Sequence, residues 1–182
     1  LHYRRMKVIA LVAAYLAVAA AQCPNLPAVQ SFDGSRYLGT WYQQATAGTQ
    51  AFEGQIKCAN AEYTLDPASN VVNVKISAQT VYGQGGSVSG TVQLVDPTKD
   101  EGDFEITLQF PFGSVSGEVK LLATDYDNYA ILYSCTMVYG QYMDYAWILT
   151  REKQAEGDEK IKIQNLIEAA LDVISSEGGP KK

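Results

Sequence analysis

The sequence has few of the residues on which most catalytic sites and metal centres depend. Among 182 residues it contains one histidine, His2, and three cysteines. His2 lies in an N-terminal segment that we expect to be removed, so the mature chain has no histidine. This excludes Ser-His-Asp and Cys-His nucleophiles, histidine-ligated zinc and histidine-ligated haem. We therefore expect no enzyme, no catalytic residue, no metal site and no required cofactor.

Basic residues are also scarce. The chain has 14 Lys and Arg against 20 Asp and Glu, and Arg4, Arg5 and Lys7 lie in the N-terminal segment, which leaves a mature net charge of −9. Nucleic acids and anionic membranes need clustered basic residues, so the sequence predicts neither partner. Beyond the N-terminal segment no apolar run is long enough to span a membrane.

The N-terminal segment, residues 1–21, predicts a signal peptide. We take Met6 as the initiator, with the residues before it as upstream translation. The uncharged stretch "VIALVAAYLAVAA", Val8 to Ala20, follows basic residues and ends in small ones. It is too short to cross a bilayer comfortably but suits a signal-peptide core. The alternative, a buried helix, accounts for neither the basic flank nor the small-residue end, so we expect a secreted, extracellular protein.

The rest of the chain suits one domain, residues 22–176, followed by a flexible tail, residues 177–182. From Trp41 to Arg151 short segments rich in Val, Ile, Thr, Tyr and Phe alternate with Gly, Pro, Asn and Asp turns. Residues 70–82 and 103–110 alternate apolar and polar side chains, as strands with one buried face do. The pattern predicts seven or eight antiparallel strands.

A single helical pattern follows the strands. Residues 158–176 place apolar side chains at helical spacing: Ile161, Ile163, Leu166, Ile167, Ala170, Leu171 and Ile174. Many antiparallel strands and one late helix indicate an all-β protein, a closed up-and-down barrel with a C-terminal α-helix packed outside, since closure removes exposed strand edges. A sandwich is the competing architecture.

Three cysteines in a secreted domain suggest one disulfide and one remaining thiol. The residues alone leave all three pairings of Cys23, Cys58 and Cys135 open. Joining Cys23 to Cys135 would close the longest loop and would tie down the N-terminal part of the domain.

The aromatic residues gather in the last part of the strand region, where Tyr129, Tyr133, Tyr139, Tyr142, Tyr145 and Trp147 fall. They suit either an ordinary core or the wall of a cavity for an apolar ligand. The two interpretations are balanced on the residues alone.

Three segments, in order, resemble the three signature regions of the lipocalin family. They are "GTWY" at 39–42, "TDYDNYAILYSC" at 124–135 and "AWILTRE" at 146–152. The opening "CPNLPAVQSFDGSRYLGTWYQQ" is most similar to the group of apolipoprotein D, the bilin-binding proteins and the crustacyanins. The resemblance covers the chain from about Cys23 to Ser175.

The resemblance implies an eight-stranded barrel that holds one small hydrophobic ligand, and the disulfide Cys23–Cys135. It also implies that Gly39 and Trp41 close one end of the barrel while Arg151 packs over the Trp41 ring in a cation–π contact. These three residues would be structural and would not touch the ligand.

Ligand contacts are expected further toward the open end. Trp147 lies on the same strand face as Arg151 because side chains repeat every two residues, and it is the first candidate for the pocket wall. Weaker candidates are Tyr63, Phe110, Tyr133 and Tyr145. A one-residue slip in register would turn any of them outward.

The function implied is that of a secreted, non-enzymatic carrier of a carotenoid, bilin, retinoid, sterol or fatty acid. One alternative is a pigment-assembly subunit that forms a homo- or hetero-oligomer around a chromophore. Another is an isomerase of the prostaglandin-synthase kind with Cys58 as nucleophile.

Cys58 departs from the family pattern. In relatives the matching cysteine pairs near the C-terminus, but residues 151–182 contain no cysteine. Cys58 is therefore expected to be a free thiol, or to bridge a second chain. A buried, inert thiol is the alternative to a reactive one.

Overall fold

The computed structural model describes residues 23–48, 56–138 and 141–153, and six residues of a C-terminal stretch, 161, 164, 165, 168, 169 and 172. The predicted signal peptide and the predicted tail lie outside the described residues. None of the described helices is long and apolar enough to cross a bilayer.

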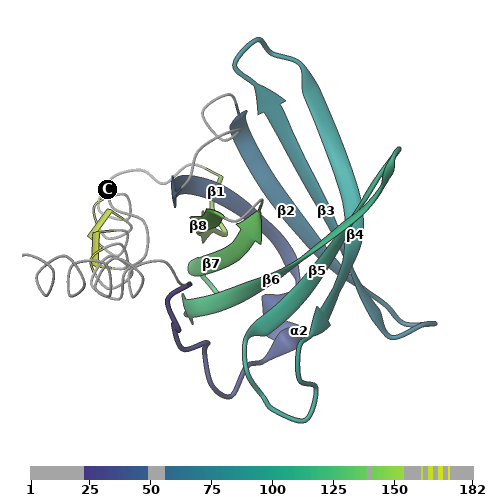
Figure 1. Cartoon of the computed structure of the whole chain (residues 1–182), viewed down its shortest axis with the longest axis vertical. Coiled ribbons are helices and arrows are strands. Elements are labelled where there is room, and N and C mark those ends of the chain that lie inside the picture. Colours follow the sequence, from purple (N-terminus) through teal and green to yellow (C-terminus); the bar gives the residue numbers. More distant parts are fainter. Residues whose placement is uncertain are drawn as a thin grey trace, which may run out of the picture.

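Eight antiparallel strands form a closed barrel in sequence order, with β1 paired to β8 (Figure 1). The strands are β1 Gly39–Gly48, β2 Ile56–Asp66, β3 Val71–Thr80, β4 Gly85–Leu94, β5 Asp103–Phe110, β6 Gly113–Thr124, β7 Tyr129–Val138 and β8 Gln141–Thr150. The prediction of an eight-stranded up-and-down barrel is confirmed, and the sandwich is wrong.

The alternation of side chains explains why these segments form one curved sheet. In β3, Val74 is buried while Asn73 and Lys75 are exposed. The same period of two buries Phe104 in β5 and leaves Glu105 in solvent. These two strands thus give one face to the barrel interior and one to water.

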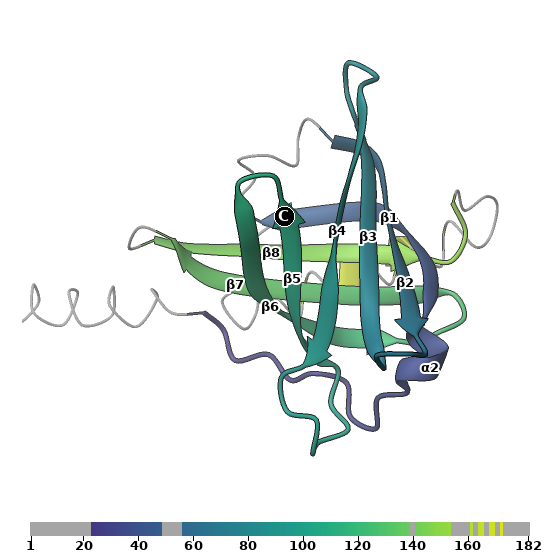
Figure 2. The ribbon, with the colours of Figure 1, turned by 90° about the vertical axis from the view of Figure 1, so that its right-hand side faces the viewer.

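The two ends of the barrel differ. A short helix, α2 Gly34–Tyr37, lies at one end, where Asp33 caps it by accepting hydrogen bonds from the backbone N–H groups of Ser35 and Arg36. We call this the closed end. The β3–β4 and β5–β6 turns, the end of β7 and the start of β8 lie at the opposite, open end (Figure 2). The connections β2–β3, β4–β5 and β6–β7 therefore belong to the closed end.

The core is densest at the closed end. Tyr37 contacts the rings of Trp41, Tyr63 and Phe104, with centroids 5.2, 5.2 and 5.8 Å away. All four side chains are buried. Such tilted and edge-on aromatic pairs each contribute about 0.5–1.5 kcal/mol beyond the area they bury.

Residues 23–32, which precede the barrel in the chain, run along its outside. A disulfide joins Cys23 to Cys135, which confirms this pairing among the three that were open. Val29 donates a hydrogen bond to the Leu121 carbonyl and accepts one from the Gly102 N–H. Leu26 packs against Tyr133 and Ala146. The disulfide, these hydrogen bonds and this packing hold residues 23–32 in place, although these residues form none of the eight strands.

The described residues of the C-terminal stretch are helical, and all six are exposed. Ile161, which the sequence pattern assigned to the buried face of this helix, is 57% exposed. That assignment is wrong for Ile161. The remaining apolar positions, Ile163, Leu166, Ile167, Ala170, Leu171 and Ile174, lie outside the described residues.

Candidate functional site

The floor of the barrel forms around Trp41, near the start of β1. Its side chain is fully buried, and its Nε1–H donates a hydrogen bond of 2.8 Å to the Tyr37 carbonyl. Gly39, two residues earlier, has φ +97°, and a Cβ there would lie 3.2 Å from Nη1 of Arg151. Glycine is the residue that adopts such a φ without strain, so it lets the chain enter β1 beneath the arginine.

Arg151 covers the floor from outside. The centre of its guanidinium lies 3.7 Å from the centroid of the Trp41 ring. The same group donates hydrogen bonds to the carbonyls of Tyr126, Thr40 and Arg36, at 3.0, 3.1 and 2.7 Å. Arg151 thus joins the β6–β7 connection, β1 and α2 across the closed end.

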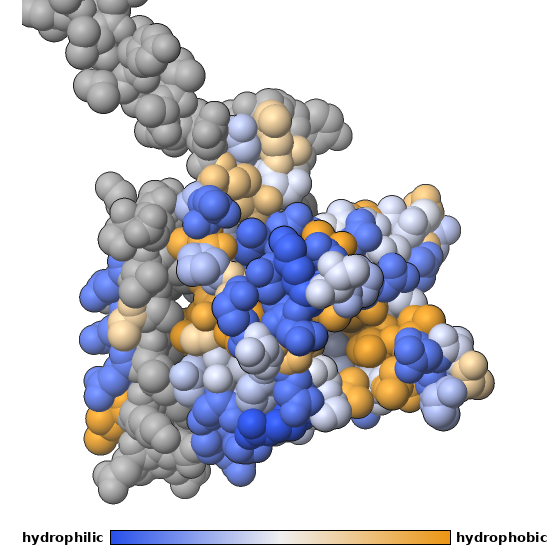
Figure 3. All heavy atoms as spheres, turned by 90° about the horizontal axis from the view of Figure 1, so that it is seen from below, coloured by the Kyte–Doolittle hydropathy of each residue, from blue (hydrophilic) through white to orange (hydrophobic). Residues whose placement is uncertain are grey.

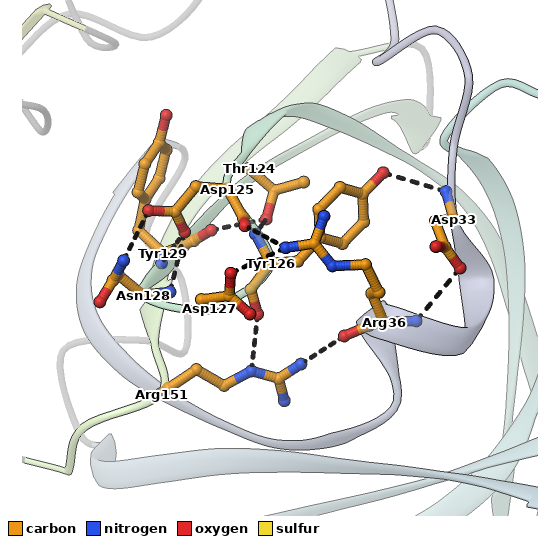
Figure 4. A network of polar contacts seen from close by, with 9 residues as sticks. All are labelled: Asp33, Arg36, Thr124, Asp125, Tyr126, Asp127, Asn128, Tyr129 and Arg151. Atoms are coloured by element: carbon orange, nitrogen blue, oxygen red, sulfur yellow. Dashed lines mark hydrogen bonds and ion pairs between the residues drawn. The ribbon is translucent and has the colours of Figure 1, made fainter.

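The β6–β7 connection is shaped by its own side chains (Figure 4). One carboxylate oxygen of Asp125 accepts hydrogen bonds from the N–H groups of Asn128 and Tyr129, and the other accepts one from the Asn128 side chain. Burial of Asp125 raises its pKa, but these hydrogen bonds outweigh burial and hold the pKa below its usual value. The loop is therefore fixed in the shape that presents the Tyr126 carbonyl to Arg151.

A second arginine holds the same loop from α2. Arg36 pairs with Asp127 at 2.7 Å and lies over the ring of Tyr126, 4.6 Å from its centroid. The Tyr126 hydroxyl in turn accepts a hydrogen bond from the Asp33 N–H. The segments "FDGSRYLGTWY" and "TDYDNY" thus meet Arg151 in one structural network.

Above the floor lies a cavity of about 380 Å³. Residues from every strand except β4 line it: Gln43, Ala59, Asn60, Ala61, Tyr63, Ile76, Ala78, Ile106, Leu108, Val115, Ser116, Gly117, Val119, Leu132, Ser134, Thr136, Trp147 and Leu149. Pockets for small ligands typically measure about 300–1,000 Å³ and are mostly apolar. The cavity can therefore enclose one small apolar molecule.

The polar groups in the cavity wall are neutral. They are the amide of Gln43, the hydroxyls of Ser134 and Thr136, and the phenol of Tyr63. Ser116 and Asn60 also border the cavity, but the Ser116 hydroxyl bonds to Thr107 on the outer face, and the strand register turns the Asn60 side chain outward. Burial raises the pKa of Tyr63 to about 12, so its hydroxyl stays protonated at physiological pH. Among the described lining residues there is no Asp, Glu, Lys, Arg or His. The wall offers hydrogen bonds but no charge.

Two of the five predicted ligand residues, Trp147 and Tyr63, line the cavity. Tyr145 stacks on Trp147, with ring centroids 5.7 Å apart and planes 16° from parallel. Tyr145 lies two residues closer to the open end along β8. Phe110 shares a strand face with the lining residues Ile106 and Leu108, but it ends β5 and is 45% exposed. It lies at the mouth of the cavity.

Tyr133 faces the other way. Its neighbours Leu132 and Ser134 line the cavity, while Tyr133 packs outside the barrel against Leu26. The alternation of side chains along β7 puts it there, and the wall position predicted for Tyr133 is wrong.

Cys58 has no disulfide partner among the described residues and is exposed, so the buried alternative is wrong. A bridge from Cys58 to a second chain stays a prediction. Cys58 sits where the β2–β3 register shifts between Lys57 and Asn60, and it has φ +53°. The next residues, Ala59 and Asn60, line the cavity, but Cys58 does not.

Sequence reasoning missed most of the aliphatic and polar wall because it searched for aromatic residues. The alternation in β5 could have identified Ile106 and Leu108, and the step of two from Trp147 could have identified Leu149. Gln43 and Asn60 carried no such signal, because each lies beside a register shift in its strand.

Comparisons with known proteins agree with this geometry. Residues 38–172 match the model of the Lipocalin / cytosolic fatty-acid binding protein family. Apolipoprotein D of Macaca fascicularis is 29% identical over 149 residues, which cover 80% of this chain and 75% of the relative. The solved structure of insecticyanin from the tobacco hornworm Manduca sexta has a TM-score of 0.71 and 28% identity, and covers 89% of this chain and 87% of its own. Lobster apocrustacyanin A1 gives a TM-score of 0.58 and 25% identity, with 84% and 87% covered.

Proposed function

Because this chain belongs to the lipocalin family, we propose that it is a secreted, non-enzymatic carrier that holds one small, uncharged, hydrophobic ligand inside its barrel. The observation that carries the proposal is the cavity of about 380 Å³, lined by Trp147, Tyr63 and aliphatic side chains above a closed floor. The disulfide Cys23–Cys135 supports secretion, since disulfides persist in oxidising compartments.

Burial alone provides enough free energy for binding. Removing about 300 Å² of apolar ligand surface from water contributes about 7.5 kcal/mol at about 25 cal/mol per Å², before ordering costs. With no ordering cost subtracted, this contribution corresponds to a dissociation constant of roughly micromolar size, which is the tightest binding that burial of this area alone would give. No covalent chemistry is needed, and the exposed thiol of Cys58 lies outside the cavity, which argues against the isomerase alternative.

The neutral wall selects among the ligand classes that the sequence suggested. An ionised carboxylate in the cavity would lose its hydration and find no positive partner among the described lining residues, at a cost of several kcal/mol. The Gln43 amide and the hydroxyl of Thr136 can instead pair with a hydroxyl or a carbonyl. A retinoid alcohol, a sterol or a carotenoid therefore suits the site better than a fatty acid or a bilin with free carboxylates.

A matched pair of ligands tests this proposal. Retinol and retinoic acid share one apolar skeleton and differ at the polar end. We expect retinol to quench Trp147 fluorescence at lower concentration than retinoic acid at neutral pH. The variant Trp147→Phe should remove most of the quenching, because Trp41 lies in the floor.

The outcomes separate the two parts of the proposal. Equal or stronger binding of retinoic acid would contradict the neutral-ligand selectivity and leave the carrier function standing. A protein that binds neither compound nor cholesterol, and that carries no extractable lipid when isolated from its source, would contradict the carrier function itself.

A further inference from the structure

Exposed hydrophobic side chains concentrate at the open end of the barrel. Six residues form what we call the open-end rim: Val81, Tyr82, Phe110, Phe112, Met137 and Tyr142. Phe112 is 100% exposed and Tyr82 is 82% exposed. Single exposed hydrophobic residues are ordinary on soluble proteins, but a group around one opening marks an interaction surface.

The rim comes from three separate parts of the barrel. Val81 and Tyr82 lie in the β3–β4 turn, Phe110 ends β5 and Phe112 lies in the β5–β6 turn, and Met137 and Tyr142 lie near the end of β7 and the start of β8. The β3–β4 turn, the β5–β6 turn and the adjoining ends of β7 and β8 lie on the side of the barrel away from α2 and stand apart from one another (Figure 2). The apolar surface is therefore a broken ring around the mouth.

The rim is continuous with the ligand cavity. Val115, the third residue of β6, is 61% exposed and also lines the cavity. Phe110 extends the strand face of the lining residue Leu108 to the edge of the barrel. An apolar path thus leads from the wall of the cavity to the tips of the turns.

Charged residues gather at the closed end, opposite to the apolar rim. The closed end carries more acidic than basic residues. Asp66 ends β2, and the connections contain Asp96, Asp100, Glu101, Asp125 and Asp127 against one basic residue, Lys99. Lys99 pairs with Asp96, and Arg36 of α2 pairs with Asp127. The molecule viewed from the side of the β4–β5 connection is largely hydrophilic at its centre, with hydrophobic patches beside it (Figure 3). At the open end, the described turns 81–84 and 111–112 contain no charged side chain. The acidic end would be repelled by an anionic surface, while the rim is electrically neutral.

We propose that the open-end rim docks on the surface of a zwitterionic lipid layer, with the mouth of the barrel facing the lipid. Tyr82, Tyr142, Phe110 and Phe112 are of the side-chain types that favour the boundary between headgroups and acyl chains. A fluid lipid surface adapts to three separate apolar tips, whereas a folded protein partner would need a complementary surface at each of the three. The lack of rim charge fits a neutral headgroup layer, and anionic lipid should weaken the contact.

Docking in this orientation would let an apolar ligand pass between lipid and cavity without crossing water. That consequence rests on the carrier function proposed above, but the docking itself does not. The two are therefore tested in separate experiments.

The test is flotation of the full mature chain with phosphatidylcholine vesicles. Phe112→Ser and Tyr82→Ser remove rim side chains that make few contacts in the protein, so folding should be unaffected and circular dichroism can verify it. Leu65→Ser and Val95→Ser are matched controls, because these residues are 44% and 49% exposed near the closed end. Ligand titration of the same variants without vesicles reports on the cavity separately.

We expect wild type and both controls to float with the vesicles, and each rim variant to lose about tenfold in partition coefficient. Replacing part of the phosphatidylcholine by phosphatidylserine should lower the bound fraction. The proposal is overturned if wild type does not float, or if rim variants and controls behave alike. It is also overturned if sedimentation shows a wild-type dimer that Phe112→Ser dissociates while no protein binds vesicles, since the rim would then join two copies of the chain.

Discussion

Arg151 offers a quantitative test of how the barrel is closed. Replacing it by methionine keeps an unbranched apolar stem over the Trp41 ring but removes the guanidinium. The substitution deletes the cation–π contact and three hydrogen bonds, to the carbonyls of Tyr126, Thr40 and Arg36. The floor would then lack the group that joins its three elements.

The expected cost follows from these contacts. A partly desolvated cation–π pair contributes about 1 kcal/mol. Three hydrogen bonds from a charged donor contribute about 1 kcal/mol each after exchange with water. Packing of the methionine stem recovers part of this, so we expect Arg151→Met to lower the free energy of unfolding by about 3 kcal/mol. For a chain of this size the melting temperature should fall by about 6–12 °C.

Urea unfolding followed by circular dichroism measures the loss, and Arg36→Met is the matched control. It removes an equal charge that contacts the same β6–β7 connection, but the ion pair of Arg36 with Asp127 has side chains 48% and 74% exposed. Such a pair contributes about 0–1 kcal/mol, so the control should lose less than about 1 kcal/mol. Arg151→Lys keeps the charge but cannot donate to all three carbonyls at once. Its loss of unfolding free energy should therefore lie between those of Arg151→Met and Arg36→Met.

The reasoning is refuted if Arg151→Met and Arg36→Met destabilise equally, or if Arg151→Lys restores full stability. Either result would mean that charge at this end, and not the specific contacts of Arg151, stabilises the floor.

Three further predictions address other parts of the barrel. The double variant Cys23→Ser, Cys135→Ser should lower the free energy of unfolding by about 2–5 kcal/mol in urea titrations, because the disulfide that closes a long loop is lost. No change would mean that residues 23–32 are held by packing alone. Gly90→Ala should lower the free energy of unfolding by more than about 1 kcal/mol in thermal melting, since the new Cβ would collide with the Thr107 carbonyl oxygen. Gly86→Ala is the control, because a Cβ at Gly86 would meet no other atom within 4 Å. Asp125→Asn should destabilise at neutral pH. Hydrogen bonds hold the folded-state pKa of Asp125 below its unfolded value, so this stabilisation is present above about pH 4 and is lost as the pH falls through the folded pKa; a penalty that persisted in acid would contradict this cause.

The strands were predictable because alternation and turn residues agree along the whole chain. The segment 103–110 shows both, and the structure ends β5 at Phe110 as the pattern indicated. The disulfide was not derivable from the residues, since loop length alone left three pairings open. The family resemblance chose Cys23–Cys135, which the structure contains.

The site was less predictable than the fold, for two physical reasons. Side-chain facing depends on register, and shifts between Gln43 and Ala45 and between Lys57 and Asn60 break the simple count along β1 and β2. Depth along the barrel depends on where each strand ends, which is why Phe110 lies at the mouth. Among the described aromatic residues of the last hairpin, Trp147 lies in the wall, Tyr142 at the mouth and Tyr133 on the outer surface, while Tyr139 lies outside the described residues.

The pairing of β1 with β8 has a consequence for how the chain acquires its structure. Residues 39–48 hydrogen-bond on one side to β2, which follows soon after in synthesis, and on the other to β8, about a hundred residues later. Until residues 141–150 are available, β1 has an unpaired edge, and Trp41 lacks the arginine that covers it. Contacts of such long sequence separation slow folding and leave edges open to aggregation. The barrel therefore cannot form progressively from its N-terminus, and chains that stop short of β8 should depend on chaperones or degradation.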